Sequence, residues 1–128
     1  MQRVLVVDDR PDVRLAFMYM LEASGYLVAE ASNGAEALVS LAREKIDVIL
    51  TDLHMPGVDG LALLRIVRQS PGPRPLLIAM SGSPNVGKGA ALDAARVLGA
   101  DAVLNKPLSR DQLVGTIREL THKGGHSR

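Results

Sequence analysis

The stretch "VLVVDD", residues Val4–Asp9, places an uninterrupted apolar run directly before two adjacent aspartates. Similar short apolar runs recur along the chain, at Leu27–Ala31, Val48–Leu50, Leu76–Met80 and Ala102–Leu104. Short runs without polar alternation are typical of strands that are covered on both faces of a parallel sheet. The sequence therefore predicts a sheet with five buried strands.

The segment after Asp9 has the clearest helical spacing. Pro11 suits the first turn of a helix, and Gly25 suits its C-terminal cap. The apolar residues follow an i, i+3, i+4, i+7, i+8 pattern, which predicts one inward face made of Val13, Ala16, Phe17, Met20 and Leu21.

Four further helices are predicted, one after each of the remaining strands. Asn33 and Glu36 indicate an N-terminal cap for one, and Ser109 and Gln112 form a capping box for the last. The other two span about Gly60–Gln69 and Gly89–Leu98. The residues predicted to face inward are Leu38, Leu41 and Ala42, then Leu61, Leu64 and Val67, then Leu113, Ile117 and Leu120.

Strands that alternate with helices indicate an α/β fold, because each crossover helix returns the chain in the same direction. We therefore expect a parallel sheet with helices on both faces. Residues 1–121 form one predicted domain. Residues 122–128, which include Gly124 and Gly125, lack a core-forming pattern and are predicted to be a flexible tail.

Composition excludes several classes of function. The net charge is +1 with no basic block, which argues against nucleic acid or anionic membranes as partners of this domain. There is no cysteine, so disulfide and thiol chemistry are excluded. The first apolar run is too short for a signal peptide or a membrane span, and we expect a cytoplasmic protein.

Polar residues that can bind ligands or take part in reactions stand at the ends of four of the predicted strands. Asp8 and Asp9 end the first, Asp52 the third, Ser81 the fourth, and Lys106 the fifth. In an open parallel sheet these strand ends share one edge, where ligands bind. The sequence thus predicts one site built from residues that are far apart in the chain.

Three carboxylates at this edge favour a bound cation, although protonation or solvation would also relieve part of their repulsion. Each pair about 4 Å apart repels by roughly 4 kcal/mol at an effective dielectric constant of about 20. Oxygen ligands of this kind suit Mg²⁺, which with the Lys106 ammonium balances the three negative charges. A carboxylate can accept a phosphoryl group. Asp52 is the predicted nucleophile, Asp8 and Asp9 the metal ligands, and Lys106 and Ser81 the groups that contact phosphoryl oxygens.

Four stretches resemble the receiver domain of response regulators, the phosphoacceptor of a His-to-Asp phosphorelay: "VLVVDD", "DVILTDLHMPGVDG", "MSG" and "GADAVLNKP". The resemblance implies a flavodoxin-like strand order 2-1-3-4-5. It implies that Mg²⁺ is bound by Asp8 or Asp9, by Asp52 and by the backbone carbonyl of His54. It also implies a signalling phosphoacceptor and not an enzyme, with the Lys106–Pro107 bond prone to the cis form.

By the same resemblance, the phosphodonor is a histidine kinase or a histidine phosphotransfer protein. Phosphorylation would switch contacts with a downstream protein, and a homodimer through the face of the fourth helix is possible. One position departs from the family: Val103 stands where receivers usually carry a tyrosine or phenylalanine. A small, stiff valine excludes the usual aromatic rotamer change as the relay. Both a stand-alone receiver and the first domain of a longer regulator fit the sequence.

Two kinds of alternative remain: a nucleotide-binding protein or enzyme, and a binding module. "GSPNVGKG", Gly82–Gly89, nearly matches the phosphate-binding P-loop, but Gly89 replaces the hydroxyl residue that contacts Mg²⁺. A nucleotide-binding protein is therefore a weaker reading, and so is a phosphatase, because His54 stands where a second acid is common. The second alternative is a pseudo-receiver, which has the fold but binds partners without phosphorylation.

Overall fold

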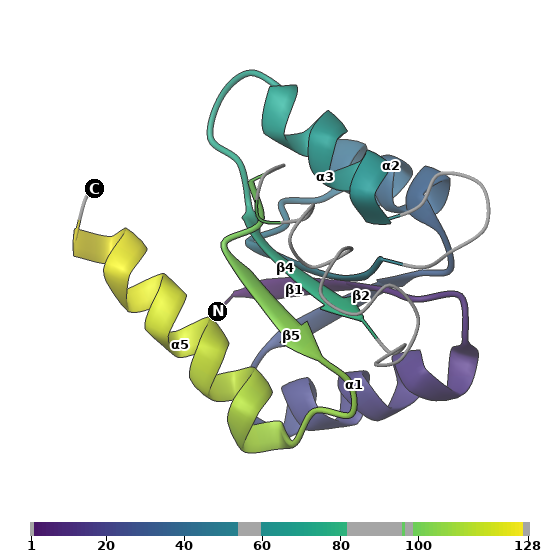
Figure 1. Cartoon of the computed structure of the whole chain (residues 1–128), viewed down its shortest axis with the longest axis vertical. Coiled ribbons are helices and arrows are strands. Elements are labelled where there is room, and N and C mark those ends of the chain that lie inside the picture. The colour runs from purple at the N-terminus through teal and green to yellow at the C-terminus, as the bar shows by residue number, and fades with distance from the viewer. Residues whose placement is uncertain (1, 54–59, 82–95, 97–98, 127–128) are drawn as a thin grey trace.

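The computed structural model describes residues 2–53, 60–81, 96 and 99–126 of the chain, with side chains as far as His122. Five parallel strands form one sheet in the order β2-β1-β3-β4-β5, which confirms the predicted fold class and strand order (Figure 1). The strands are β1 (Arg3–Val7), β2 (Leu27–Ala31), β3 (Val48–Asp52), β4 (Leu76–Ser81) and β5 (Ala102–Asn105).

Helices cover both faces of the sheet. In Figure 1, α2 (Gly34–Arg43) and α3 (Gly60–Gln69) lie on one face, and α1 (Pro11–Ala23) and α5 (Arg110–His126) lie on the other. Alternate residues of the central strands contribute to two separate hydrophobic cores, one on each face of the sheet, because successive side chains of a strand point to opposite faces. Leu5, Ile49 and Leu77 pack on the α2/α3 side, whereas Val4, Val48 and Ile78 pack on the α1/α5 side.

α1 follows its prediction except at one residue. It begins at Pro11, and Gly25 follows the helix with a φ of +92°, a conformation that glycine adopts without strain. Phe17 and Leu21 are buried, but Ala16 is exposed, so its predicted inward position was wrong. Ala16 borders an open cleft beside Leu108, and its short side chain does not reach the core.

The second helix also follows its prediction except at one residue. Asn33 caps α2 as predicted, since its Oδ1 accepts a hydrogen bond of 2.9 Å from the Glu36 amide. Ala37 is fully buried, and Leu38 and Leu41 pack against the core. Ala42 was predicted to face inward but is exposed, because it lies to one side of the stripe that these three residues form.

The predictions for α3 and for the start of α5 are confirmed. In α3, Leu64 and Val67 are buried as predicted, and Leu63 is buried as well. The capping box of α5 is confirmed by two reciprocal bonds between Ser109 and Gln112, of 3.0 and 3.1 Å. The predicted helix at 89–98 falls almost wholly outside the described residues.

The C-terminal end of α5 differs from its prediction. The helix continues to His126, so most of the segment predicted as a flexible tail is helical. A glycine within a helix costs only about 1 kcal/mol relative to alanine, which does not by itself end a helix. The domain boundary at residue 121 stays a prediction. Within the described residues, no helix is long and apolar enough to cross a membrane.

Candidate functional site

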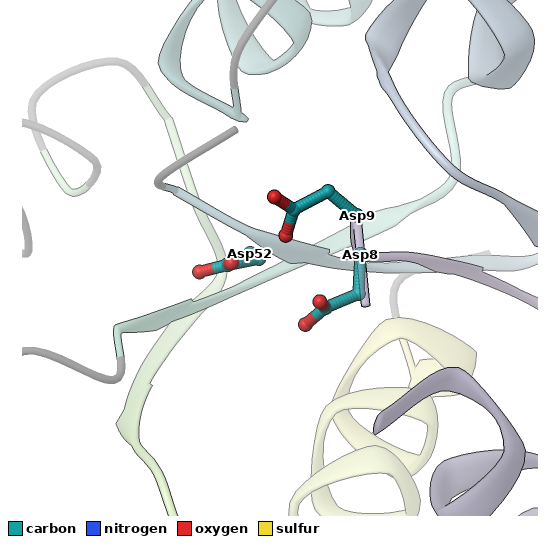
Figure 2. A group of neighbouring side chains, drawn as sticks. All are labelled: Asp8, Asp9 and Asp52. Atoms are coloured by element: carbon teal, nitrogen blue, oxygen red, sulfur yellow. The ribbon is translucent and has the colours of Figure 1, made fainter. Parts of the chain in front are cut away.

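Three aspartates meet at the carboxyl end of the sheet. Asp8 and Asp9 follow β1, and Asp52 is the last residue of β3, the strand beside it. One carboxylate oxygen from each residue lies within 4.8 Å of the others, and Figure 2 shows the three carboxyl groups pointing toward a common space. Asp8 and Asp52 are buried, while Asp9 is exposed. The predicted acidic cluster is therefore present.

Lys106 bridges two of these acids. Its Nζ lies 2.6 Å from Oδ2 of Asp8 and 3.5 Å from Oδ2 of Asp52. The lysine is placed by the end of β5, where its backbone amide donates a 2.9 Å hydrogen bond to the carbonyl of Ser81. The Lys106–Pro107 peptide bond is cis, the form to which the family resemblance implied that it is prone. The ammonium group thus neutralises part of the acidic cluster.

Ser81 lies at the same end of the sheet. It is the last residue of β4, and only 8% of its surface is exposed. The preceding residue, Met80, pairs with Asp52 in the β3–β4 ladder, and the Leu53 amide donates to the Met80 carbonyl at 3.0 Å. Four of the five predicted positions of the site, counting the Asp8–Asp9 pair as one, are therefore brought together.

The remaining predicted position is His54, whose backbone carbonyl was expected to bind the metal. His54 lies outside the described residues, and so does the P-loop-like stretch at 82–89. Both assignments stay predictions.

Close packing holds the backbone of Asp52. The hydroxyl of Thr51 donates a 3.0 Å hydrogen bond to the Asp52 carbonyl. At Gly60, the first residue of α3, a Cβ atom would clash with that carbonyl oxygen and would lie 2.7 Å from the Cα of Leu53. Only glycine fits there, which gives the Gly60 of the quoted motif a steric reason.

Three contacts around Asp8 were not predicted. The backbone amide of Arg10 donates to Oδ1 of Asp8 at 3.0 Å. Nη1 of Arg14 donates to the backbone carbonyl of Asp8 at 2.8 Å, and Nε of Arg14 donates to Oε1 of Glu30 at 2.8 Å. The Arg14–Glu30 contact joins α1 to β2 across the edge of the sheet, and no local sequence pattern predicts such a pair.

The residues present fit a divalent cation with hard oxygen ligands. Three carboxylates against one ammonium group leave a formal charge of −2 (−3 + 1). Mg²⁺ binds oxygen ligands at about 2.0–2.1 Å, so two ligand oxygens on one ion lie up to about 4.2 Å apart. The observed limit of 4.8 Å needs only a small movement of the carboxylates to match this spacing.

The acidic cluster opens into a cleft of about 640 Å³. One wall carries the polar residues of the site, and the other is the apolar side of α1. The lining residues are Asp9, Arg10, Asp12, Val13, Ala16, Phe17, Met20, Asp52, Lys106, Pro107 and Leu108. Asp52 therefore lines this cleft together with Asp9 and Lys106.

The three acids and Lys106 lie at the carboxyl end of an open parallel sheet, which is where ligands of doubly wound α/β domains bind. Residues 4–118 match the family described as the response regulator receiver domain. The chain belongs to this family, whose members in general serve as signalling phosphoacceptors of two-component systems.

Relatives of known name agree with this membership. The chain is 36% identical over 121 residues to the response regulator MprA of Mycobacterium leprae, covering 94% of this chain and 51% of that protein. It is 41% identical over 106 residues to protein-glutamate methylesterase/protein-glutamine glutaminase 3 of Hahella chejuensis, covering 81% of this chain and 29% of that protein. The chain thus spans about half or less of these relatives.

Solved structures show the same fold over nearly the whole chain. A receiver domain from Bermanella marisrubri has a TM-score of 0.83 at 33% identity, covering 93% of this chain and 97% of that one. A CheY-like receiver domain protein from Methanospirillum hungatei has a TM-score of 0.88 at 26% identity, covering 100% and 99%.

Proposed function

We propose that Asp52 accepts a phosphoryl group from a phosphohistidine, on a histidine kinase or a histidine phosphotransfer protein, with Mg²⁺ at the acidic cluster. The observation that carries this proposal is the convergence of the three carboxylates within 4.8 Å, with the Lys106 ammonium bridging Asp8 and Asp52. Asp8, Asp9 and Asp52 are the side chains that would hold the ion.

In the proposed step, an oxygen of the Asp52 carboxylate attacks phosphorus. A P–O bond forms as the P–N bond to the donor imidazole breaks, and the imidazole leaves with the electron pair. The bound cation would neutralise charge on the phosphoryl oxygens. The Lys106 ammonium lies near enough to Asp52 to pair with a phosphoryl oxygen once the carboxylate is phosphorylated. Ser81, on the neighbouring strand, would donate its hydroxyl to another phosphoryl oxygen.

Burial of the acceptor supports a phosphoryl group that is stable enough to signal. Asp52 is only 6% exposed, so its environment amplifies the electrostatic interactions of the site. The switched contacts with a downstream protein remain part of the proposal. Val103, on β5, packs against the α2/α3 core and replaces the usual aromatic residue, so the relay would use other side chains.

The test is to incubate the protein with Mg²⁺ and acetyl phosphate and to measure its intact mass. We expect a gain of one phosphoryl group that is absent without Mg²⁺ and absent in Asp52→Asn. Asp47→Asn is a matched control, because Asp47 lies at the opposite end of the same strand and should leave the gain unchanged.

The alternatives predict different results. No mass gain together with saturable ATP binding would support the nucleotide-binding reading. No mass gain and no ATP binding would support a pseudo-receiver. Either result would overturn the phosphoacceptor proposal.

A further inference from the structure

Arg14 links the acidic cluster to the edge of the sheet. Its guanidinium donates from Nη1 to the backbone carbonyl of Asp8 and from Nε to the carboxylate of Glu30, each at 2.8 Å. The Arg14 side chain is only 15% exposed, whereas Glu30 is 46% exposed. A planar guanidinium with two such partners has a fixed orientation. The contact is therefore a directed one and not a loose surface ion pair.

With the Arg14 contact, both the backbone amide and the backbone carbonyl of Asp8 have hydrogen-bond partners. The Asp8 amide donates to the Ala31 carbonyl at 3.1 Å, which extends the β1–β2 ladder by one residue. The Asp8 carbonyl follows the last ladder residue of β1 and receives the Arg14 donor instead. Arg14 thus holds the peptide plane between Asp8 and Asp9.

The Asp9 side chain extends from the backbone that this peptide plane begins. Asp8 is also held through its side chain by Lys106 and by the Arg10 amide. Asp9 is exposed, and its position relative to Asp8 and Asp52 depends on the backbone that precedes it. Rotation of the 8–9 peptide would move the Asp9 oxygen away from the other two acids.

We infer that Arg14, oriented by Glu30, is a positioning residue for the cation site. It fixes the Asp8 carbonyl and thereby holds the Asp9 carboxylate near Asp8 and Asp52. This inference rests on the proposed function, since it concerns the same acidic cluster. Hydrogen-bond partners that orient metal ligands change metal affinity about 10–100-fold when they are removed.

Because Arg14 is positively charged, the direction in which its substitution changes the Mg²⁺ affinity distinguishes a charge effect from a positioning effect. Removing a positive charge near the cluster would by itself strengthen Mg²⁺ binding, because less repulsion acts on the cation. Losing the position of Asp9 would weaken it. The two explanations therefore predict opposite signs for the same substitution.

The experiment is an Mg²⁺ titration of the unphosphorylated protein at constant ionic strength, followed by backbone amide shifts in NMR spectra. For Arg14→Gln we expect the Mg²⁺ Kd to rise about tenfold. Arg3→Gln is the matched control. Arg3 forms an ion pair of 3.6 Å with Glu44 near the other end of β1, with its side chain 32% exposed. It should leave the Mg²⁺ Kd unchanged.

A second readout separates positioning from general damage. The rate of phosphorylation by acetyl phosphate should recover in Arg14→Gln when Mg²⁺ is raised to saturation, because Asp52 itself is intact. If Arg14→Gln does not fold, Arg14→Lys keeps the charge but cannot span both partners with one ammonium group. It should raise the Kd several-fold.

The outcomes are distinct. An Mg²⁺ Kd in the Arg14 variant that equals or falls below the wild-type value overturns the inference and leaves the proposed function standing. A wild-type protein that binds no Mg²⁺ overturns the proposed function, and this inference with it.

Discussion

The two ends of the sheet handle their carboxylates in different ways. At the amino end, Oδ2 of Asp47 accepts the Arg3 amide at 2.9 Å, and Oδ2 of Asp101 accepts the Leu77 amide at 2.8 Å. Asp101 also pairs with the Arg74 guanidinium at 3.1 Å. At the carboxyl end, three acids gather around one ammonium group.

The polarity of the strands explains the difference. Strand beginnings present backbone N–H groups, which an acid can accept, whereas strand ends present carbonyl groups, which repel it. Acids at the amino end therefore complete the fold by themselves. The three clustered acids at the carboxyl end repel one another, and Lys106 offsets only part of their charge.

The largest expected effect contrasts one glycine from each end. In Gly60→Ala, the new Cβ meets the backbone of Asp52 and Leu53, which cannot move aside cheaply. We expect a loss of about 3 kcal/mol or more in the free energy of unfolding, measured by urea denaturation. In Gly99→Ala, the nearest described atoms to the new Cβ belong to the flexible side chain of Arg68, and the φ of +103° costs about 1–2 kcal/mol.

Gly115→Ala is the control for both substitutions. It lies on the exposed side of α5, and a Cβ there would meet nothing within 4 Å. Alanine in place of a helical glycine should stabilise the protein by about 0.5–1 kcal/mol. A Gly60→Ala protein as stable as wild type would refute the steric account of the Asp52 backbone.

The next effect concerns the amino end alone. Asp101→Ala removes the acceptor of the Leu77 amide and the partner of Arg74. Because the pair is partly exposed, we expect a loss of about 2 kcal/mol in unfolding free energy, with or without Mg²⁺. Asp101→Asn keeps an acceptor for Leu77 and should cost about half as much. If either loss of stability depended on Mg²⁺, the account of the amino-end acids as purely structural would be contradicted.

Removing an acid at the carboxyl end of the sheet should raise the stability of the protein, whereas removing Asp101 at the amino end lowers it. Asp9→Asn removes one of three repelling carboxylates, so without Mg²⁺ the protein should become about 1 kcal/mol more stable in urea denaturation. Saturation at tenfold above the Kd adds about 1.4 kcal/mol to the wild type, and the variant should lose most of this gain. Asp12→Asn, which removes an exposed acid paired with Arg10, is the control and should not gain stability.

The smallest effect involves a carboxyl-end acid that has found backbone donors. Glu36 accepts hydrogen bonds of 2.6 Å from the hydroxyl and from the amide of Ser32, which follows β2. These bonds, the side-chain one foremost, lower the pKa of Glu36 below its ordinary value of 4.5. A lowered pKa contributes stability above the ordinary value, and this contribution is lost as the pH falls through the folded-state pKa.

Glu36→Gln should therefore be slightly less stable than wild type at pH 7, and the difference should shrink as the pH falls below about 4.5. Urea denaturation at pH 7 and pH 3 measures both values. A difference that grows at pH 3 would contradict this account of Glu36.

Much of the fold follows from local patterns. The apolar runs marked every strand to within two residues, and the caps at Asn33 and Ser109 were visible because capping uses neighbouring residues. The errors at Ala16 and Ala42 arose because alanine tolerates either face of a helix. The continuation of α5 past residue 121 was missed because polar residues mark neither a helix nor a tail.

The sequence by itself determined which residues end the strands, and hence that Asp8, Asp9, Asp52, Ser81 and Lys106 share one edge of the sheet. Strand ends are set by composition that can be read locally, and parallel connection then fixes their common edge. Only the tertiary structure decided that Lys106 lies nearer to Asp8 than to Asp52, and that Arg14 takes the Asp8 carbonyl and Glu30. Such contacts depend on side-chain rotamers and on the packing of elements distant in the chain, which no local pattern encodes.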